Sequence, residues 1–179
     1  MGLFLTSLGI LFGVTLIAFL VLRLQIGRAW PDLPPLPRIL WISTSVIVLS
    51  SATMQWGLSS IRRGRGGVLS VAMLLTLALG FAFLALQSLA WLRWLAPAVE
   101  RWNQSEEWRF ALTSFYLFTA LHALHVVGGL LPMTLVTWRS LRPGRYSATD
   151  HAGVHLCAMY WHFLAVVWLV LFATLMIGV

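Results

Sequence analysis

The sequence predicts an all-α integral membrane protein, a bundle of five transmembrane helices that forms a single membrane domain over residues 1–179. Of its 179 residues, 60% are hydrophobic and only 9% are charged, and the mean hydropathy is +0.88. A soluble domain needs far more charge to coat its exterior. The apolar residues are gathered in stretches of about 20 or more, the length that a helix needs to cross the hydrocarbon layer. Helices are expected at about residues 3–22, 39–61, 68–91, 110–138 and 151–178.

The first helix is predicted from a run of about twenty apolar residues that begins at Leu3 and ends at Leu22. No basic residue precedes this run and no Ala-x-Ala site follows it, which favours a spanning helix over a cleaved signal. Gly9 and Gly13 have the spacing that can seat a neighbouring helix closely. The prolines of residues 23–38 then predict an extended connection, because proline lacks an amide donor.

The second helix carries a seam of serine, threonine and glutamine side chains. Their hydroxyls are expected mainly to bond to their own helix, with bridges to a neighbouring helix as the alternative. The seam consists of Ser43, Thr44, Ser45, Ser50, Ser51, Thr53 and Gln55. A basic turn follows at residues 62–67. Its glycines are typical of phosphate-binding loops, but the Gly-Lys-Ser/Thr ending is missing, so we expect no nucleotide site.

The last two helices are predicted from residues 110–138 and 151–178. Ser105, which lies in the preceding connection at residues 93–109, is expected to cap the start of the fourth helix. Pro132 removes one helical hydrogen bond, so a kink is expected there. The final seventeen residues of the fifth helix's run carry neither charge nor histidine, which is typical of a membrane span.

The formal net charge of +7 comes from twelve arginines in four connections between helices; the chain has no lysine. No long basic face with interleaved aromatics is present, which excludes a nucleic-acid groove, and arginine at helix ends is the usual topogenic pattern. Residues 62–67 and 139–150 share one side with six arginines and one acid, whereas the other side has six arginines and four acids. This favours a cytoplasmic N-terminus and an outer C-terminus.

Histidines are concentrated in or beside the last two helices. His125 and His162 come at similar depth, counted from the connection at residues 139–150, and two imidazoles at equal depth on antiparallel helices could ligate a b-type haem. The alternative is that each imidazole forms a hydrogen bond across a helix interface. Trp161 and Phe163 flank His162 and would crowd a haem ring. Both interpretations stay open from the residues alone.

The remaining polar residues form no recognisable catalytic or metal-binding pattern. The interiors of the last two predicted helices contain no Asp or Glu, which argues against a zinc-type site and against an acid–base pair at membrane depth. We therefore expect no catalytic and no metal site. The single cysteine, Cys157, excludes an internal disulfide and is interpreted as a small buried apolar residue.

Two blocks of sequence resemble a known family. The run from Tyr160 to Phe172 reads YWHFLAVVWLVLF, and the run from Phe115 to Gly129 reads FYLFTALHALHVVGG. They resemble the last helix and the preceding helix of subunit III of the haem–copper respiratory oxidases. The blocks come in the right order, about one hairpin apart. The chain resembles the short, five-helix bacterial form of that subunit over nearly its whole length.

The resemblance implies a non-catalytic subunit of a bacterial inner-membrane oxidase, cytochrome c oxidase above all. It would bind no cofactor itself, would pack on subunit I beside subunit II, which hold the haems and copper, and would retain membrane phospholipid. It would thereby support oxygen reduction and proton pumping. A subunit-III-like component of a quinol oxidase or nitric oxide reductase system is a related alternative, and a small b-type cytochrome is the alternative from another class.

The resemblance also assigns roles to residues. Arg139 matches the family's basic position just past the fourth helix, where it is expected to anchor a lipid phosphate. The motif residues expected to be interfacial and structural are His122, His125, His155, Tyr160, Trp161, His162 and Trp168. His155 and Ala165 replace carboxylates that are usual in the family, which removes support for a proton-handling role. We expect His162→Leu to weaken association with the partner subunit by leaving a facing polar group unpaired.

Overall fold

The computed structural model describes residues 1–27, 37–102, 105–142 and 144–178. Five helices make up this part of the chain, and each is long and apolar enough to cross a membrane. The predicted all-α class with five spanning helices is therefore confirmed. The helices are α1 (Gly2–Ile26), α2 (Ile39–Arg62), α3 (Gly66–Arg101), α4 (Glu106–Ser140) and α5 (Ala152–Gly178).

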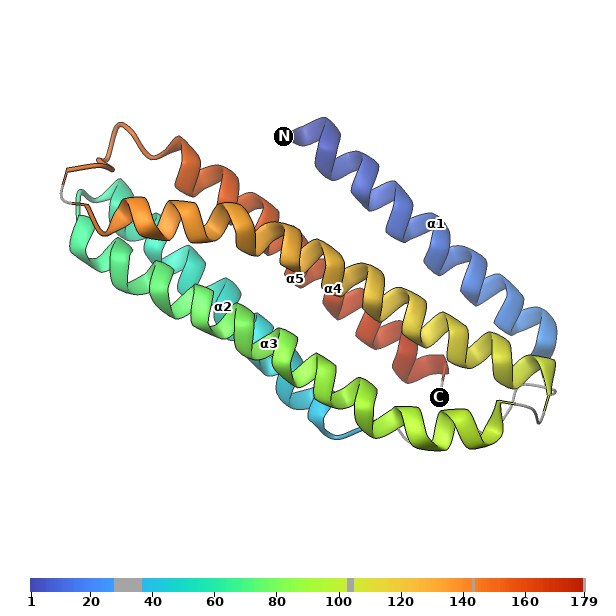
Figure 1. The fold of residues 1–179 in the computed structure, drawn as a ribbon. Helices are drawn as coiled ribbons and strands as arrows, with labels where there is room; N and C mark the ends of the chain where they lie inside the picture. Colours follow the sequence, from blue (N-terminus) through green and yellow to red (C-terminus); the bar gives the residue numbers. More distant parts are fainter. Residues whose placement is uncertain (28–36, 103–104, 143, 179) are drawn as a thin grey trace.

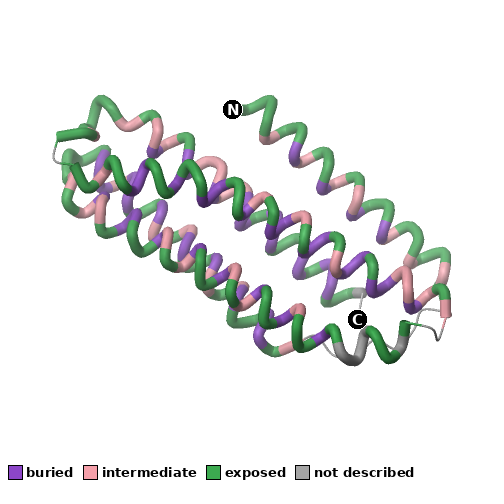
Figure 2. The backbone as a smooth tube through the Cα atoms, in the orientation of Figure 1, coloured by how far each residue is buried: buried purple, intermediate pink, exposed green. Residues whose placement is uncertain are grey.

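Helices α2 to α5 form the body of the molecule (Figure 1). α2 contacts α3, α3 contacts α4, α4 contacts α5, and α5 returns to α2, so the four helices enclose one core. α1 lies outside this body along α4 and α5 and diverges from them toward its N-terminus. Buried residues line the inward faces of the helices, and exposed residues cover the outward faces (Figure 2). The outward faces are rich in Leu, Ile, Val and Trp, as lipid contact requires.

The hairpin between α3 and α4 is longer than the sequence predicts. α3 continues to Arg101 and α4 already begins at Glu106, so most of the expected connection at residues 93–109 is helical. The cause is tertiary, because the buried Trp94 ring packs on Phe115 with 4.3 Å between the ring centroids. The Ser105 cap is confirmed, since its hydroxyl accepts a hydrogen bond from the backbone amide of Trp108 at 3.3 Å.

Two further expectations concern the first connection and the helix around Pro132. Residues 28–36 of the first connection, which include most of its prolines, lie outside the described residues. α4 remains helical through Pro132 from Glu106 to Ser140. The expected kink at that position stays a prediction.

The closest helix approach occurs at glycines other than the pair noted in the sequence, since a Cβ atom on Gly9 would lie at an ordinary contact distance of 3.8 Å from the Phe163 ring of α5. A Cβ atom on Gly13 would meet nothing within 4 Å, so this glycine does not seat a neighbouring helix. A Cβ on Gly80 of α3 would lie 2.9 Å from the Trp161 ring, and one on Gly129 of α4 would lie 2.7 Å from the Tyr160 ring. These two glycines let α5 pack closely against α3 and α4.

Candidate functional site

α5 carries the aromatic and polar side chains that connect the bundle. Trp161 and Trp168 are fully buried, and each indole donates its N–H to a hydroxyl on α2. Trp161 Nε1 lies 2.9 Å from Ser50 Oγ, and Trp168 Nε1 lies 3.0 Å from Thr44 Oγ1. Ser50 in turn donates to the carbonyl oxygen of Thr76 on α3 at 3.2 Å. The seam of α2 thus supplies acceptors to a neighbouring helix, beyond the bonds to its own helix that the sequence favoured.

His162 also faces α2. Its Nδ1 lies 2.6 Å from Ser51 Oγ, and its Nε2 lies 3.2 Å from Gln55 Oε1. Because an amide oxygen can only accept, Nε2 carries the proton and Nδ1 accepts from the Ser51 hydroxyl. The polar groups that face His162 therefore belong to this chain, whereas the sequence analysis placed such a group on a partner subunit.

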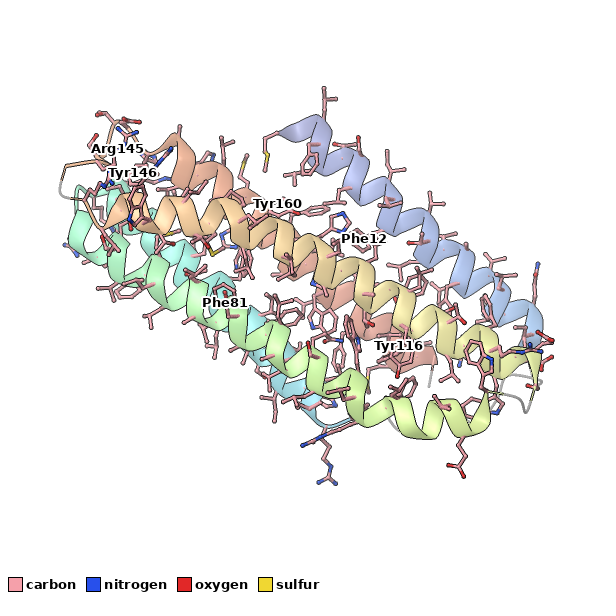
Figure 3. All side chains as sticks on the ribbon, viewed as in Figure 1. Phe12, Phe81, Tyr116, Arg145, Tyr146 and Tyr160 are labelled. Carbon is pink, nitrogen blue, oxygen red and sulfur yellow. The ribbon has the colours of Figure 1, made fainter. Side chains whose placement is uncertain are left out.

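Tyr160 lies on the side of α5 that faces α1 (Figure 3), and its closest polar contact is with His125 of α4. The Tyr160 hydroxyl donates to the backbone carbonyl of His125 at 3.0 Å, and the ring of Tyr160 stacks against the bare backbone of Gly129. His125 Nδ1 donates to the carbonyl oxygen of Leu121 in its own helix at 2.7 Å. Its ring contacts Phe12 of α1, with 5.3 Å between the centroids.

The structure does not bring His125 and His162 together as a haem pair. His125 faces α1, whereas His162 faces α2 with both ring nitrogens already hydrogen-bonded. The equal depth suggested by counting along the helices therefore does not place the two imidazoles on one site, and the b-type cytochrome alternative is not favoured.

His122 occupies the centre of the core without a hydrogen-bond partner. Its side chain is fully buried, and neither ring nitrogen has a partner among the described residues. Aromatic rings surround it, with centroids of Trp168 at 5.2 Å and Phe83 at 5.9 Å. The expectation that this imidazole bonds across a helix interface is wrong; its contacts are ring contacts.

Gln87 is a second buried polar group without a hydrogen-bond partner among the described residues. It is 1% exposed, and neither its amide oxygen nor its amide nitrogen has a partner within the described residues. It lines a cleft of about 300 Å³ between α3 and α4. A glutamine within an apolar run is the signal that could have marked it, but the sequence cannot show whether its amide is satisfied.

His155 and Arg139 lie near the end of the bundle where α4 passes into α5. His155 is half-buried, and its Nδ1 has no hydrogen-bond partner among the described residues. Arg139 is exposed in the last turn of α4, where a cation complements the helix dipole. Burial raises the pKa of the neighbouring Tyr146 phenol, although Arg139 and Arg145 act to lower it. The phenol stays neutral beside these cations.

The chain resembles proteins of known name. A family model described as cytochrome c oxidase subunit III matches residues 1–178. A relative from Synechocystis sp. (strain ATCC 27184 / PCC 6803 / Kazusa) named cytochrome c oxidase subunit 3 is 36% identical over 158 residues. One of the same name from Thermostichus vulcanus is 34% identical over 176 residues, and one from Mus musculus is 28% identical over 162 residues.

These matches cover most of this chain but less of some relatives. They include 87%, 97% and 84% of this chain, respectively. The same matches include 64% of the Synechocystis protein, 83% of the Thermostichus protein and 56% of the mouse protein. The chain thus spans less than two thirds of the length of two of these three relatives.

Proposed function

Because the chain belongs to the cytochrome c oxidase subunit III family, we propose that it is the third subunit of a respiratory oxidase of the cytochrome c oxidase type. In this role it has no active site and no redox centre of its own, and the haems and copper reside in subunits I and II. It supports the oxygen-reducing, proton-pumping complex by packing on subunit I and by retaining phospholipid. The family match over residues 1–178 is the observation that carries this proposal.

The chemistry of α4 and α5 supports a structural role. The sequence has no Asp or Glu between Glu107 and Asp150 and none from residue 151 to 179, so neither helix offers a carboxylate at membrane depth for acid–base work. The indoles of α5 and the imidazole of His162 form hydrogen bonds to α2 within the chain. Groups committed in this way hold helices together, and the lone pair of His162 is not free to ligate a metal.

Lipid retention is supported by a cleft between α1 and the α4–α5 pair. The cleft has a volume of about 590 Å³ and is lined mainly by apolar side chains, among them Phe4, Leu124 and Tyr160. An acyl chain is the chemistry that such walls accommodate in a bilayer. Arg139 is the residue that we assign to a lipid phosphate.

We further propose that the protein lies in the bacterial inner membrane with its N-terminus in the cytoplasm. The α2–α3 and α4–α5 connections reach the same end of the bundle (Figure 1). Six arginines and one acid belong to these connections and their helix ends. Arginine-rich short loops remain on the cytoplasmic side during insertion.

Affinity purification of this chain from its native membranes in mild detergent tests the proposal. We expect oxidase subunits I and II to co-purify, and we expect the reduced-minus-oxidised spectrum of the eluate to show haem bands that follow those subunits. Purification of the chain expressed without its partners is the control and should give a colourless protein. A haem band that follows this chain alone would refute the proposal and would make His125 and His162 the residues to substitute.

A further inference from the structure

The groove between α2 and α5 on the outside of the bundle places polar side chains at membrane depth. It has a volume of about 470 Å³. We name it the α2–α5 groove. Its principal lining residues are Val48, Ala52 and Gln55 of α2, and His162, Val166 and Leu169 of α5. Val48, Val166 and Leu169 are exposed, so the groove opens toward the surroundings of the protein.

Gln55 has an unfulfilled hydrogen-bonding capacity in this groove. Its Oε1 accepts from His162, but its amide nitrogen, which carries two N–H donors, has no acceptor among the described residues. Gln55 is exposed, so these donors face outward. No other part of the described chain covers these two N–H donors.

The depth of Gln55 makes this arrangement costly in lipid. Gln55 stands seven residues before Arg62, the last residue of α2, which corresponds to about 10 Å along the helix. His162 lies ten residues after Ala152, the first residue of α5, or about 15 Å along that helix. α2 is about 36 Å long and α5 about 40 Å, so with each helix centred on a hydrocarbon core about 30 Å thick, both side chains lie inside the core. Neither water nor a lipid ester group is available there to accept from the amide.

Three other exposed polar side chains in the spans do not share this problem. The hydroxyls of Ser7, Ser45 and Ser88 each donate to a backbone carbonyl of their own helix, at 3.0, 3.0 and 2.9 Å. They can face lipid at little cost, because no donor is left unpaired. The amide nitrogen of Gln55, by contrast, has no backbone carbonyl acceptor among the described residues.

We infer that the α2–α5 groove is the docking surface for a transmembrane helix of another subunit, and that this helix presents a side-chain oxygen to the amide of Gln55. The inference rests on the proposed function, which places the chain in a complex of several subunits. The acceptor is a side chain because the backbone carbonyls of a spanning helix are already used within it. The small side chain of Ala52, three residues before Gln55 on the same face, lets the incoming helix approach closely.

Site-specific photocrosslinking in the intact complex tests the docking surface. Benzoyl-phenylalanine is placed at position 52 in the groove, and at positions 131 and 17 as controls on the exposed faces of α4 and α1. Leu131 and Ile17 are 68% and 63% exposed, so both control positions are accessible to a neighbouring chain. After irradiation of native membranes, the complex is purified, and crosslinked peptides are identified by mass spectrometry.

The expected result is a crosslink from position 52 to a transmembrane helix of another oxidase subunit, within reach of a Ser, Thr, Asn, Gln or carboxylate side chain. Crosslinks to other subunits from position 131 or 17 alone, with the complex intact, would overturn the docking surface and leave the proposed function standing. Crosslinks from position 52 only to lipid, or to a second copy of this chain, would overturn it as well. If no oxidase subunit co-purifies with the unmodified chain, the proposed function itself fails.

Two substitutions provide a second measurement. Ala52→Phe fills the groove but leaves the Ser51, Gln55 and His162 bonds in place, so it should lower the recovery of the chain with its partners. Gln55→Leu removes the amide and should weaken association by about threefold, and by no more than about twentyfold. Leu131→Phe is the matched control and should leave recovery unchanged. Equal recovery of all three variants would contradict the docking surface.

Discussion

Ser50→Ala is expected to destabilise the bundle, because Ser50 joins three helices through one oxygen atom. Its hydroxyl accepts from Trp161 Nε1 of α5 at 2.9 Å and donates to the Thr76 carbonyl of α3 at 3.2 Å. Ser50 and Trp161 are both fully buried, so the indole N–H would be left unpaired. Hydrogen bonds between membrane helices contribute about 0.6 kcal/mol on average and up to about 1.7 kcal/mol each. Loss of two such bonds predicts about 1–3 kcal/mol.

The assay is reversible unfolding of the purified protein in mixed detergent micelles, followed by helical circular dichroism as SDS is added. A double-mutant cycle with Trp161→Phe isolates the shared bond, because the effect of Ser50→Ala should be smaller when no indole N–H remains to be left unpaired. Ser45→Ala is the matched control. Ser45 is exposed, bonds only to its own helix at 3.0 Å, and should change stability by less than about 0.5 kcal/mol.

Two results would refute this reasoning. If Ser50→Ala and Ser45→Ala had equal effects on the free energy of unfolding, the bonds from Ser50 to α3 and α5 would contribute nothing measurable. If the effects of Ser50→Ala and Trp161→Phe were additive, the two side chains would not be coupled, and the indole would have another partner.

Three further substitutions test other parts of the bundle in the same unfolding assay. His122→Leu should raise the free energy of unfolding by about 1 kcal/mol, because it removes a buried imidazole without hydrogen bonds; a loss would reveal a hidden partner. Gly129→Ala should destabilise by about 1–3 kcal/mol, since its Cβ would lie 2.7 Å from Tyr160, whereas Gly13→Ala should be neutral or stabilising; similar effects would contradict close packing at Gly129. Ser105→Ala should cost about 1 kcal/mol through loss of the α4 cap, and no change would mean that another group caps the helix.

Features that depend on neighbouring residues in the chain were predictable from the sequence. The five spans follow from the lengths of the apolar runs, since the thickness of the hydrocarbon layer fixes the required length. The start of α4 was marked by Ser105, because a cap depends only on the residue type and the first turn after it. The resemblance in the last two helices led to the family that the comparisons show.

The end of α3 was not predictable in the same way. Arg93 and Pro97 look like the start of a connection, yet α3 continues past both to Arg101. The contact of Trp94 with Phe115 is between different helices and leaves no local pattern. A propensity that favours a turn was overridden by tertiary packing.

The side chains and helices that each histidine contacts could not be predicted from the sequence either. Spacing along one helix gives the angle between two side chains, but it does not say which neighbouring helix each one meets. His122 and His125 share a face of α4 and both rings lie near Phe12 of α1, yet His122 also contacts Phe83 of α3 and Trp168 of α5 in the core. Only the arrangement of the bundle separates them, and it also separates His125 from His162.

The lengths of α3 and α4 have a consequence for what stands outside the lipid. With 36 and 35 residues, the two helices are each more than 50 Å long at about 1.5 Å per residue. A bilayer with its headgroups is about 45 Å thick, so an upright helix of this length extends beyond it at one end at least. Figure 1 shows the paired ends of α3 and α4 reaching beyond α2 and α5. The result is a helical projection at this end of the bundle, held by the contact of Trp94 with Phe115, and its tip carries Glu106 and Glu107.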